Sequence, residues 1–98
     1  MNYLILDGLK MFTKEEAHRH IKEGFQFPDY YGANLDALYD LLSVWSEPVE
    51  VHVENYDAMI GSLGKYGSDL IKTIIEAGHE NWKVNLVIEE EKNETDHT

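Results

Sequence analysis

Short apolar runs alternate with amphipathic stretches along this chain of 98 residues. The apolar runs at residues 3–6 and 84–88 have the length of buried strands. Between them, residues 49–54 alternate valine with charged or polar residues, which predicts a third strand with one face better buried than the other. The chain is therefore expected to contain three strands.

A helix is predicted between the first two strands, at about residues 14–24. Thr13 is followed by Glu16 three residues later, which is the pattern of a capping box. The residues expected to face inward on this helix are Ala17, His20 and Ile21.

Two further helices are predicted after the valine-rich strand. A short one covers residues 55–63 and is closed by Gly64, and a longer one begins at Ser68 as its N-cap and ends near Gly78. The apolar residues of the longer helix are Leu70, Ile71, Ile74 and Ile75.

Strands that alternate with helices imply crossover connections and a parallel sheet with helices on its faces. The expected fold class is thus α/β, with three parallel strands and about four helices. A chain of this length fits one domain, predicted at residues 1–89. Residues 90–98 are acidic, polar and poor in apolar residues, and they are expected to form a disordered tail.

The segment between the first helix and the valine-rich strand carries the densest signals. Pro28 fixes its own φ and pushes Phe27 towards an extended conformation, so no helix passes this point. Gly32 is expected to supply a turn with φ > 0. Asn34 is expected to be the N-cap of a new helix, because its side-chain oxygen can accept a hydrogen bond from a free helix N–H.

The helix after Asn34 separates apolar from polar residues. Its apolar face consists of Leu35, Leu38, Leu41 and Leu42, and its polar face of Asp36, Tyr39, Asp40 and Ser43. The two aspartates are one turn apart, and like charges at this spacing destabilise a helix by roughly 0.2–0.5 kcal/mol.

Three tyrosines, Tyr30, Tyr31 and Tyr39, accompany these aspartates and are expected to be exposed. Since tyrosine is enriched at protein interfaces, acids beside exposed aromatics favour a binding surface for a partner. A polar face that is simply solvated is the alternative.

The pattern P-[DE]-YYG-x-NLDAL, followed by an aromatic residue and an aspartate, occupies residues 28–40. It resembles the barstar family of intracellular inhibitors, whose partner barnase is a secreted, guanyl-specific ribonuclease. The resemblance is densest over residues 28–45 and extends to about Glu89. It implies a small α/β fold with a three-stranded parallel sheet, and a one-to-one complex with a basic ribonuclease of the barnase type.

The resemblance also implies roles for individual residues. Asp40 would occupy the phosphate-binding site of the nuclease, Asp36 would be a second inhibitory carboxylate, and Tyr30 would pack against the catalytic histidine. Glu80 is a further, weaker match at the edge. The expected partner-binding residues are Tyr30, Tyr31, Gly32, Asn34, Leu35, Asp36, Tyr39, Asp40, Val44, Trp45, Thr73 and Glu76.

This chain departs from the family's prototype at several of these positions. Tyr39 stands in place of a tryptophan, Val44 in place of a glycine and Thr73 in place of a valine. These changes suggest a relative with its own cognate ribonuclease. The resemblance further implies a cis peptide bond between Glu47 and Pro48, which is uncommon for X–Pro bonds in general.

Composition narrows the function classes further. A formal net charge of −11, from 19 acidic and 8 basic residues, disfavours direct binding to nucleic acid and favours a basic protein partner. Solubility alone is the alternative explanation. The chain has no cysteine, no apolar stretch long enough to cross a membrane and no signal-peptide pattern, so a cytoplasmic location is expected.

Other chemistry finds little support. The histidines are scattered and no metal-ligand or phosphate-loop motif occurs, so neither a metal nor a cofactor is expected. Two carboxylates on one exposed helix lack a pocket, so the protein is not expected to be an enzyme. Trp45 and Trp82 are expected to be packing residues, with Trp45 also bordering the interface. An immunity or regulatory protein for a different basic nuclease or toxin, such as a DNase, is the alternative function.

Overall fold

The computed structural model describes residues 2–89 of the chain. Its elements are β1 (Asn2–Asp7), the 3-10 helix η1 (Gly8–Lys10), α1 (Lys14–Phe25), α2 (Leu35–Ser43), β2 (Val49–Glu54), α3 (Tyr56–Leu63), α4 (Lys65–Glu80) and β3 (Val84–Ile88). The predicted three strands and four helices are confirmed, and the predicted tail at residues 90–98 lies outside the described residues. None of the helices in this part of the chain is long and apolar enough to span a membrane.

The three strands form one parallel sheet in the order β1-β2-β3. In the central strand, Val49, Val51 and Val53 are almost completely buried, and Val51 pairs with Leu4 on one side and Leu86 on the other. The valines therefore form the middle of the core beneath the sheet, as their alternation predicts.

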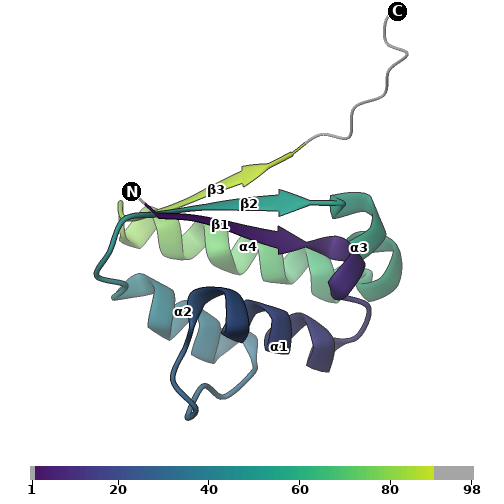
Figure 1. Ribbon diagram of the computed structural model, residues 1–98, viewed down its shortest axis with the longest axis horizontal. Helices are drawn as coiled ribbons and strands as arrows, with labels where there is room; N and C mark the ends of the chain where they lie inside the picture. Colours follow the sequence, from purple (N-terminus) through teal and green to yellow (C-terminus); the bar gives the residue numbers. More distant parts are fainter. Residues whose placement is uncertain (1, 90–98) are drawn as a thin grey trace, which may run out of the picture.

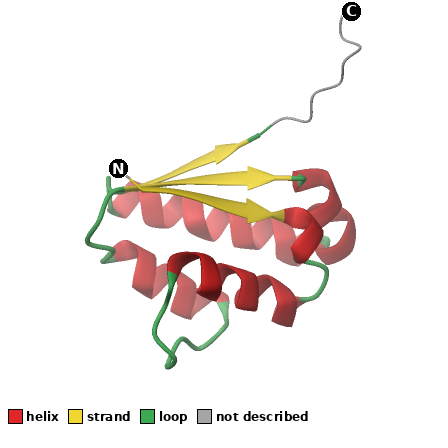
Figure 2. Cartoon of the chain, in the orientation of Figure 1, coloured by secondary structure: helices red, strands yellow, loops and turns green. Residues whose placement is uncertain are grey.

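All the helices lie on one face of the sheet, as Figures 1 and 2 show. The sequence predicts helices on the faces of the sheet, and in the structure they cover one face. Both connections move one strand further in the same direction, and right-handed crossovers in such an order place every helix on the same side. α2 packs on α4 within the helical layer. The other face of the sheet is open, and Tyr3 and Ile5 are 62% and 41% exposed there.

Helix α1 begins as predicted, with Thr13 Oγ1 accepting a hydrogen bond from the Glu16 N–H at 3.0 Å. The buried histidine, however, is His18 and not His20. His18 lies three residues before Ile21 and seven before Phe25, so it shares their buried face. His20 is half-buried, and its Nε2 accepts a hydrogen bond from the backbone N–H of Asp7 at the end of β1.

Helix α4 begins three residues before the predicted N-cap Ser68. Gly64 closes α3 with φ = 60° and also precedes the first residue of α4, so a single residue joins the two helices. A positive φ is accessible to glycine without strain, which allows this early start. On α4, Leu70, Ile71 and Ile74 are buried, whereas Ile75 is 40% exposed.

Two further expectations are corrected near the amino-terminal ends of the strands. The described residues contain no cis peptide bond, so Glu47–Pro48 is trans, the form that X–Pro bonds favour by about 0.5–1 kcal/mol. Trp45 packs edge-on against Phe25 and Phe27, as a packing residue should. Trp82, in contrast, is 76% exposed, because it lies in the tight turn between α4 and β3 and not in an element that faces the core.

Candidate functional site

The loop before α2 turns at Pro28, whose carbonyl accepts a hydrogen bond from the N–H of Tyr31 at 3.0 Å. The residue with positive φ is Ala33 (φ = 56°) and not Gly32 as predicted. A left-handed conformation costs a residue with a Cβ about 1–2 kcal/mol, so the loop stores strain next to the helix. A Cβ added to Gly32 would meet only Ala37 Cβ at 3.4 Å and Asn34 Nδ2 at 3.5 Å, which are ordinary contacts. The fold itself therefore does not require glycine at position 32.

Asn34 caps α2 as predicted, since its Oδ1 accepts a hydrogen bond from the N–H of Ala37 at 2.8 Å. Leu38 and Leu42 are fully buried, and Leu35 and Leu41 are half-buried against the same core. The cap and this apolar face together fix the rotation of the helix, so its opposite face points to solvent.

Asp36 and Asp40 are both exposed on that opposite face. Within residues 2–89, no nitrogen of a lysine, arginine or histidine lies within 4.0 Å of either carboxylate. The two charges stand one helical turn apart without a cation to offset their repulsion. They are therefore available to cations from outside the chain.

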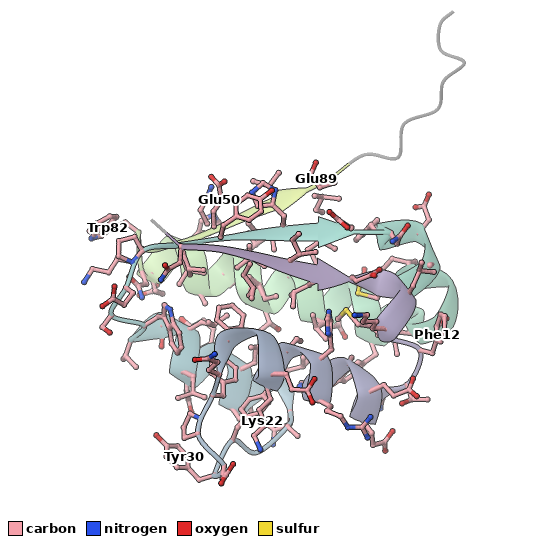
Figure 3. The ribbon with its side chains drawn as sticks, viewed as in Figure 1. Phe12, Lys22, Tyr30, Glu50, Trp82 and Glu89 are labelled. Carbon is pink, nitrogen blue, oxygen red and sulfur yellow. The ribbon has the colours of Figure 1, made fainter. Side chains whose placement is uncertain are left out.

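The tyrosines next to these acids differ sharply in exposure. Tyr30 is 80% exposed, and Figure 3 shows it at the outer end of the loop, pointing away from the sheet. Tyr39 on α2 is half-buried. Tyr31 is only 8% exposed, so the prediction that its ring would be exposed is wrong. Its hydroxyl instead lies 2.6 Å from Nδ1 of the buried His18.

His18 connects the loop to the helical layer. Its Nε2 lies 2.6 Å from the hydroxyl of Tyr66 on α4, so one imidazole bridges two tyrosines from distant parts of the chain. A neutral imidazole has one N–H donor and one acceptor, which matches two hydroxyl partners. Burial lowers the pKa of His18 and so favours this neutral form. The bridge holds the loop that carries Tyr30.

The surface continues from α2 onto α4. Tyr39, Glu76, His79 and Glu80 line an open depression of about 430 Å³ between the two helices. The structure thus brings the predicted Tyr39 and Glu76 together, along with Glu80. His79 was not anticipated, although its position three residues after Glu76 places it on the same side of the helix.

The remaining predicted residues lie at the margins. Thr73 is half-buried one turn before Glu76, and its Oγ1 donates a hydrogen bond to the Asp69 carbonyl at 2.8 Å. Val44 follows α2 directly and is 74% exposed, whereas Trp45 turns inward and is half-buried. Thr73 and Trp45 are therefore mainly held by contacts within the fold.

This geometry can be set beside known proteins. The family described as "Barstar (barnase inhibitor)" matches residues 1–95, which is nearly the whole chain. The chain belongs to the barstar family. A relative from Bacillus subtilis (strain 168), named "Putative ribonuclease inhibitor YrdF", is 38% identical over 81 residues, or 82% of this chain and 89% of the relative.

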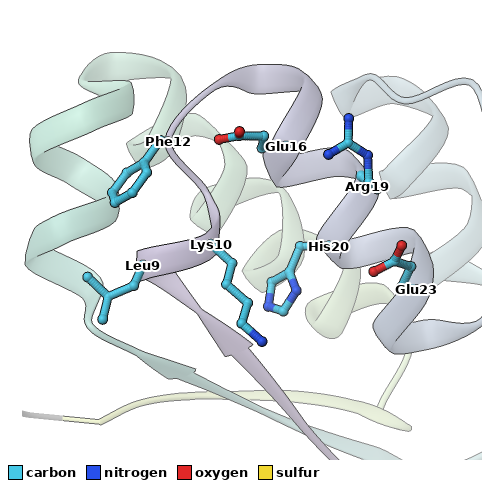
Figure 4. Close-up of a pocket in the computed structure, with 7 residues that line it drawn as sticks. All are labelled: Leu9, Lys10, Phe12, Glu16, Arg19, His20 and Glu23. Carbon is cyan, nitrogen blue, oxygen red and sulfur yellow. The ribbon is translucent and has the colours of Figure 1, made fainter.

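This barstar-family protein also has a second hollow, between η1 and α1 (Figure 4). Its volume is about 290 Å³, and its charged lining mixes both signs, with Lys10 and Arg19 beside Glu16 and Glu23. Phe12 is 49% exposed at its rim. Its mixture of charges distinguishes this hollow from the uniformly acidic face of α2. No group of three or more potential metal ligands with suitable geometry occurs in the described part of the chain.

Proposed function

We propose that this protein inhibits a basic ribonuclease of the barnase type by closing its active site in a one-to-one complex. The carboxylates of Asp36 and Asp40 would stand where the phosphates of the substrate bind. One observation carries the proposal: in a barstar-family chain, α2 presents two exposed carboxylates without a cation, beside the exposed ring of Tyr30.

The electrostatics support this assignment. A site that cleaves RNA needs cations for the phosphate, and carboxylates form strong charge-assisted hydrogen bonds with arginine, lysine and protonated histidine. A net charge of −11 would also steer the inhibitor towards a cationic cleft and raise the association rate. The same charge disfavours RNA as a direct ligand.

Each structural role follows from what the residue contacts. Tyr30 offers an exposed ring to the partner. Gly32 has no side chain and so leaves room for the backbone of the partner to approach closely. Asn34 and Leu35 contribute by fixing the start of α2, and Tyr31 contributes through His18 by holding the loop. The margin would then be formed by Tyr39, Val44, Trp45, Thr73 and Glu76.

The proposal includes a cytoplasmic location and no catalytic activity of the protein's own. An inhibitor of this kind binds through a surface of about 800 Å² on each partner. The loop leads directly into α2, and the depression lined by Tyr39, Glu76, His79 and Glu80 joins α2 to α4. Such an interface can lie across these three segments.

The test is a titration of barnase with the purified protein at low and at physiological salt, with Asp40→Ala alongside. We expect complete inhibition at one equivalent, an association rate that falls with salt, and a loss of inhibition in the variant. Glu23→Ala removes the same charge from the mixed hollow on α1 and serves as the matched control. Inhibition that both variants retain in full would contradict the proposal.

A second candidate is an immunity protein for another basic nuclease or toxin, such as a DNase. Val44 favours it, because an exposed β-branched side chain stands at the end of α2 where the family's prototype has glycine. A folded protein that spares barnase and blocks a DNase would select this candidate.

A further inference from the structure

Two exposed apolar side chains, Val44 and Trp82, belong to segments that meet at the carboxyl end of α2. Trp82 is 76% exposed and Val44 is 74% exposed, among the highest values for large apolar residues in the described chain. Trp82 lies at the edge of the molecule in Figure 3, by the amino-terminal ends of the strands. The hydrophobic burial available to a tryptophan is large, so leaving it in water gives up much of that stabilisation.

Asn81 joins the two chain segments that carry these side chains. Its Nδ2 donates hydrogen bonds to the carbonyls of Leu42 (2.9 Å) and Trp45 (3.0 Å). Val44 lies between those two residues in the chain, and Trp82 directly follows Asn81. Val44 and Trp82 are thus each within two residues, along the chain, of a residue that takes part in these two hydrogen bonds at the carboxyl end of α2.

The turn that carries Trp82 is also rigid. The N–H of Asn81 donates to the Ala77 carbonyl at 2.9 Å, and its Oδ1 accepts from the N–H of Lys83 at 3.1 Å. The N–H of Val84 donates to the Asn81 carbonyl at 3.0 Å. A side chain on a fixed turn loses little further backbone freedom when it binds, and such residues make effective anchors in interfaces.

We propose that Trp82 and Val44 extend the inhibitory surface and contact the nuclease beyond its cationic cleft. This inference rests on the proposed function and specifies its partner further. Lys83 Nζ already lies 5.7 Å from the centre of the Trp82 ring, so another cation would be repelled there. The complementary feature on the nuclease is an apolar or aromatic side chain at the margin of its active site. Because both residues belong to segments joined at the carboxyl end of α2, the partner that covers the acidic face of α2 is the one expected to contact them.

The experiment uses the full-length protein labelled with 5-fluorotryptophan. The chain has two tryptophans, so its fluorine spectrum contains two resonances, and Trp82→Phe assigns them. Barnase at natural abundance is the probe. We expect the Trp82 resonance to shift up to one equivalent of barnase and to lose its sensitivity to exchange of H₂O for D₂O.

Affinity measurements complete the test. Trp82→Ala is expected to weaken binding roughly fivefold or more, because truncated interface tryptophans commonly have such effects. Phe12→Ala removes a comparably exposed aromatic ring from the other hollow and is expected to leave affinity within about twofold. Equal melting temperatures of the variants and the wild type would show that folding is not the cause.

Three results would overturn the inference. An unchanged Trp82 resonance in a complex that requires Asp40 would refute the extension while leaving the proposed function intact. A resonance that moves with the concentration of the free protein, and a sedimentation coefficient altered by Trp82→Ala, would assign the patch to a second copy of this chain. Failure of the folded wild-type protein to inhibit barnase would remove both the extension and the function on which it rests.

Discussion

Two surfaces of this protein combine carboxylates with tyrosine, and they differ in what the carboxylates contact. On the open face of the sheet, His52 lies between two acids from β2 and the end of β3. Its Nε2 is 2.7 Å from Glu50 Oε1, and its Nδ1 is hydrogen-bonded to Glu89. The Tyr3 ring lies 4.2 Å from the imidazole. Figure 3 labels both glutamates.

On α2, carboxylates and tyrosine also occur together, but without a cation of the fold beside the carboxylates. Hydrogen bonds to Glu89 and then Glu50 raise the pKa of His52, which favours the charged imidazolium between them. Among residues 2–89, neither Asp36 nor Asp40 has a cationic side chain within 4.0 Å. Glu50 and Glu89 are thus paired with a cation of the fold, whereas Asp36 and Asp40 are available to a cation from a partner.

The largest effect is expected for Asp40→Ala. The complex should lose about 2–5 kcal/mol, mostly as a faster dissociation rate, since cations of the nuclease would stay buried and unpaired; barnase–barstar itself contributed to this range. The free energy of unfolding should change little, because the carboxylate is exposed and its removal relieves a like-charge pair. Stopped-flow dissociation and denaturant unfolding measure the two quantities. An affinity loss below tenfold would refute the role given to Asp40.

Asp36→Ala should cost less, about 1–2 kcal/mol of binding. Asp36 lies in the first turn of α2, where the helix dipole already favours its negative charge, so its need for an outside cation is smaller. The same dissociation assay ranks the two variants. If Asp36→Ala proved more damaging than Asp40→Ala, this ordering would be wrong.

Gly32→Ala tests the loop separately from the charges. The new Cβ would make only ordinary van der Waals contacts, so the free energy of unfolding should stay within about 0.5 kcal/mol of the wild-type value. Binding should weaken by about 1 kcal/mol or more if the backbone of the partner approaches here. Thermal unfolding and isothermal titration provide the two values. Unchanged affinity would mean that position 32 does not face the partner.

Much of α2 could be predicted from sequence because its signals are local. The cap at Asn34 and the leucine spacing specify the helix and its rotation without reference to the rest of the chain. The neighbouring tyrosines could not be told apart in this way. Tyr31 is buried because its hydroxyl contacts Nδ1 of His18 on α1, and Nε2 of the same imidazole contacts the hydroxyl of Tyr66 on α4. Such distant contacts leave no local pattern in the sequence.

Three other features could not be predicted from the sequence either. The helices cover one face of the sheet because the strands lie in the order β1-β2-β3, and this order cannot be read from the amino-acid sequence. The residue type of Trp82 favours a packing role, yet its place in a three-residue turn exposes it. In the sequence, His52 is one of several scattered histidines, and only the pairing of β2 with β3 brings Glu89 beside it. For the sheet and for His52, the deciding information lies in the pairing of distant segments, whereas the local turn decides the exposure of Trp82.

The contributions of His18 and His52 to stability should depend on pH in opposite directions. Burial lowers the pKa of His18 below its ordinary value of 6.5, so the unfolded chain takes up a proton first and stability falls as pH drops below about 6.5. Tyr31 and Tyr66 face its ring, and Lys14 lies 4.6 Å from the centre of the Tyr66 ring. Melting temperatures between about pH 7.5 and 5.5 should fall less in His18→Gln than in the wild type. Parallel profiles would contradict this assignment.

The smallest effect is expected for His52→Gln. The pKa of His52 is raised by Glu89 and Glu50, so its contribution to stability is complete below about pH 6.5 and is lost as pH rises through the folded-state pKa. The variant should therefore be most affected at acidic pH, opposite to His18→Gln, with no change in inhibition. A loss of inhibition would show that the open sheet face also binds the partner.

The most direct measurement compares Asp40→Asn with Glu50→Gln, which each remove one negative charge from a nearly unchanged shape. Barnase affinity should fall more than about tenfold for Asp40→Asn and stay close to the wild-type value for Glu50→Gln, at both low and physiological salt. Equal losses in the two variants, vanishing together at high salt, would show that net charge alone governs binding. That result would contradict the claim that the unpaired carboxylates of α2 form the inhibitory site.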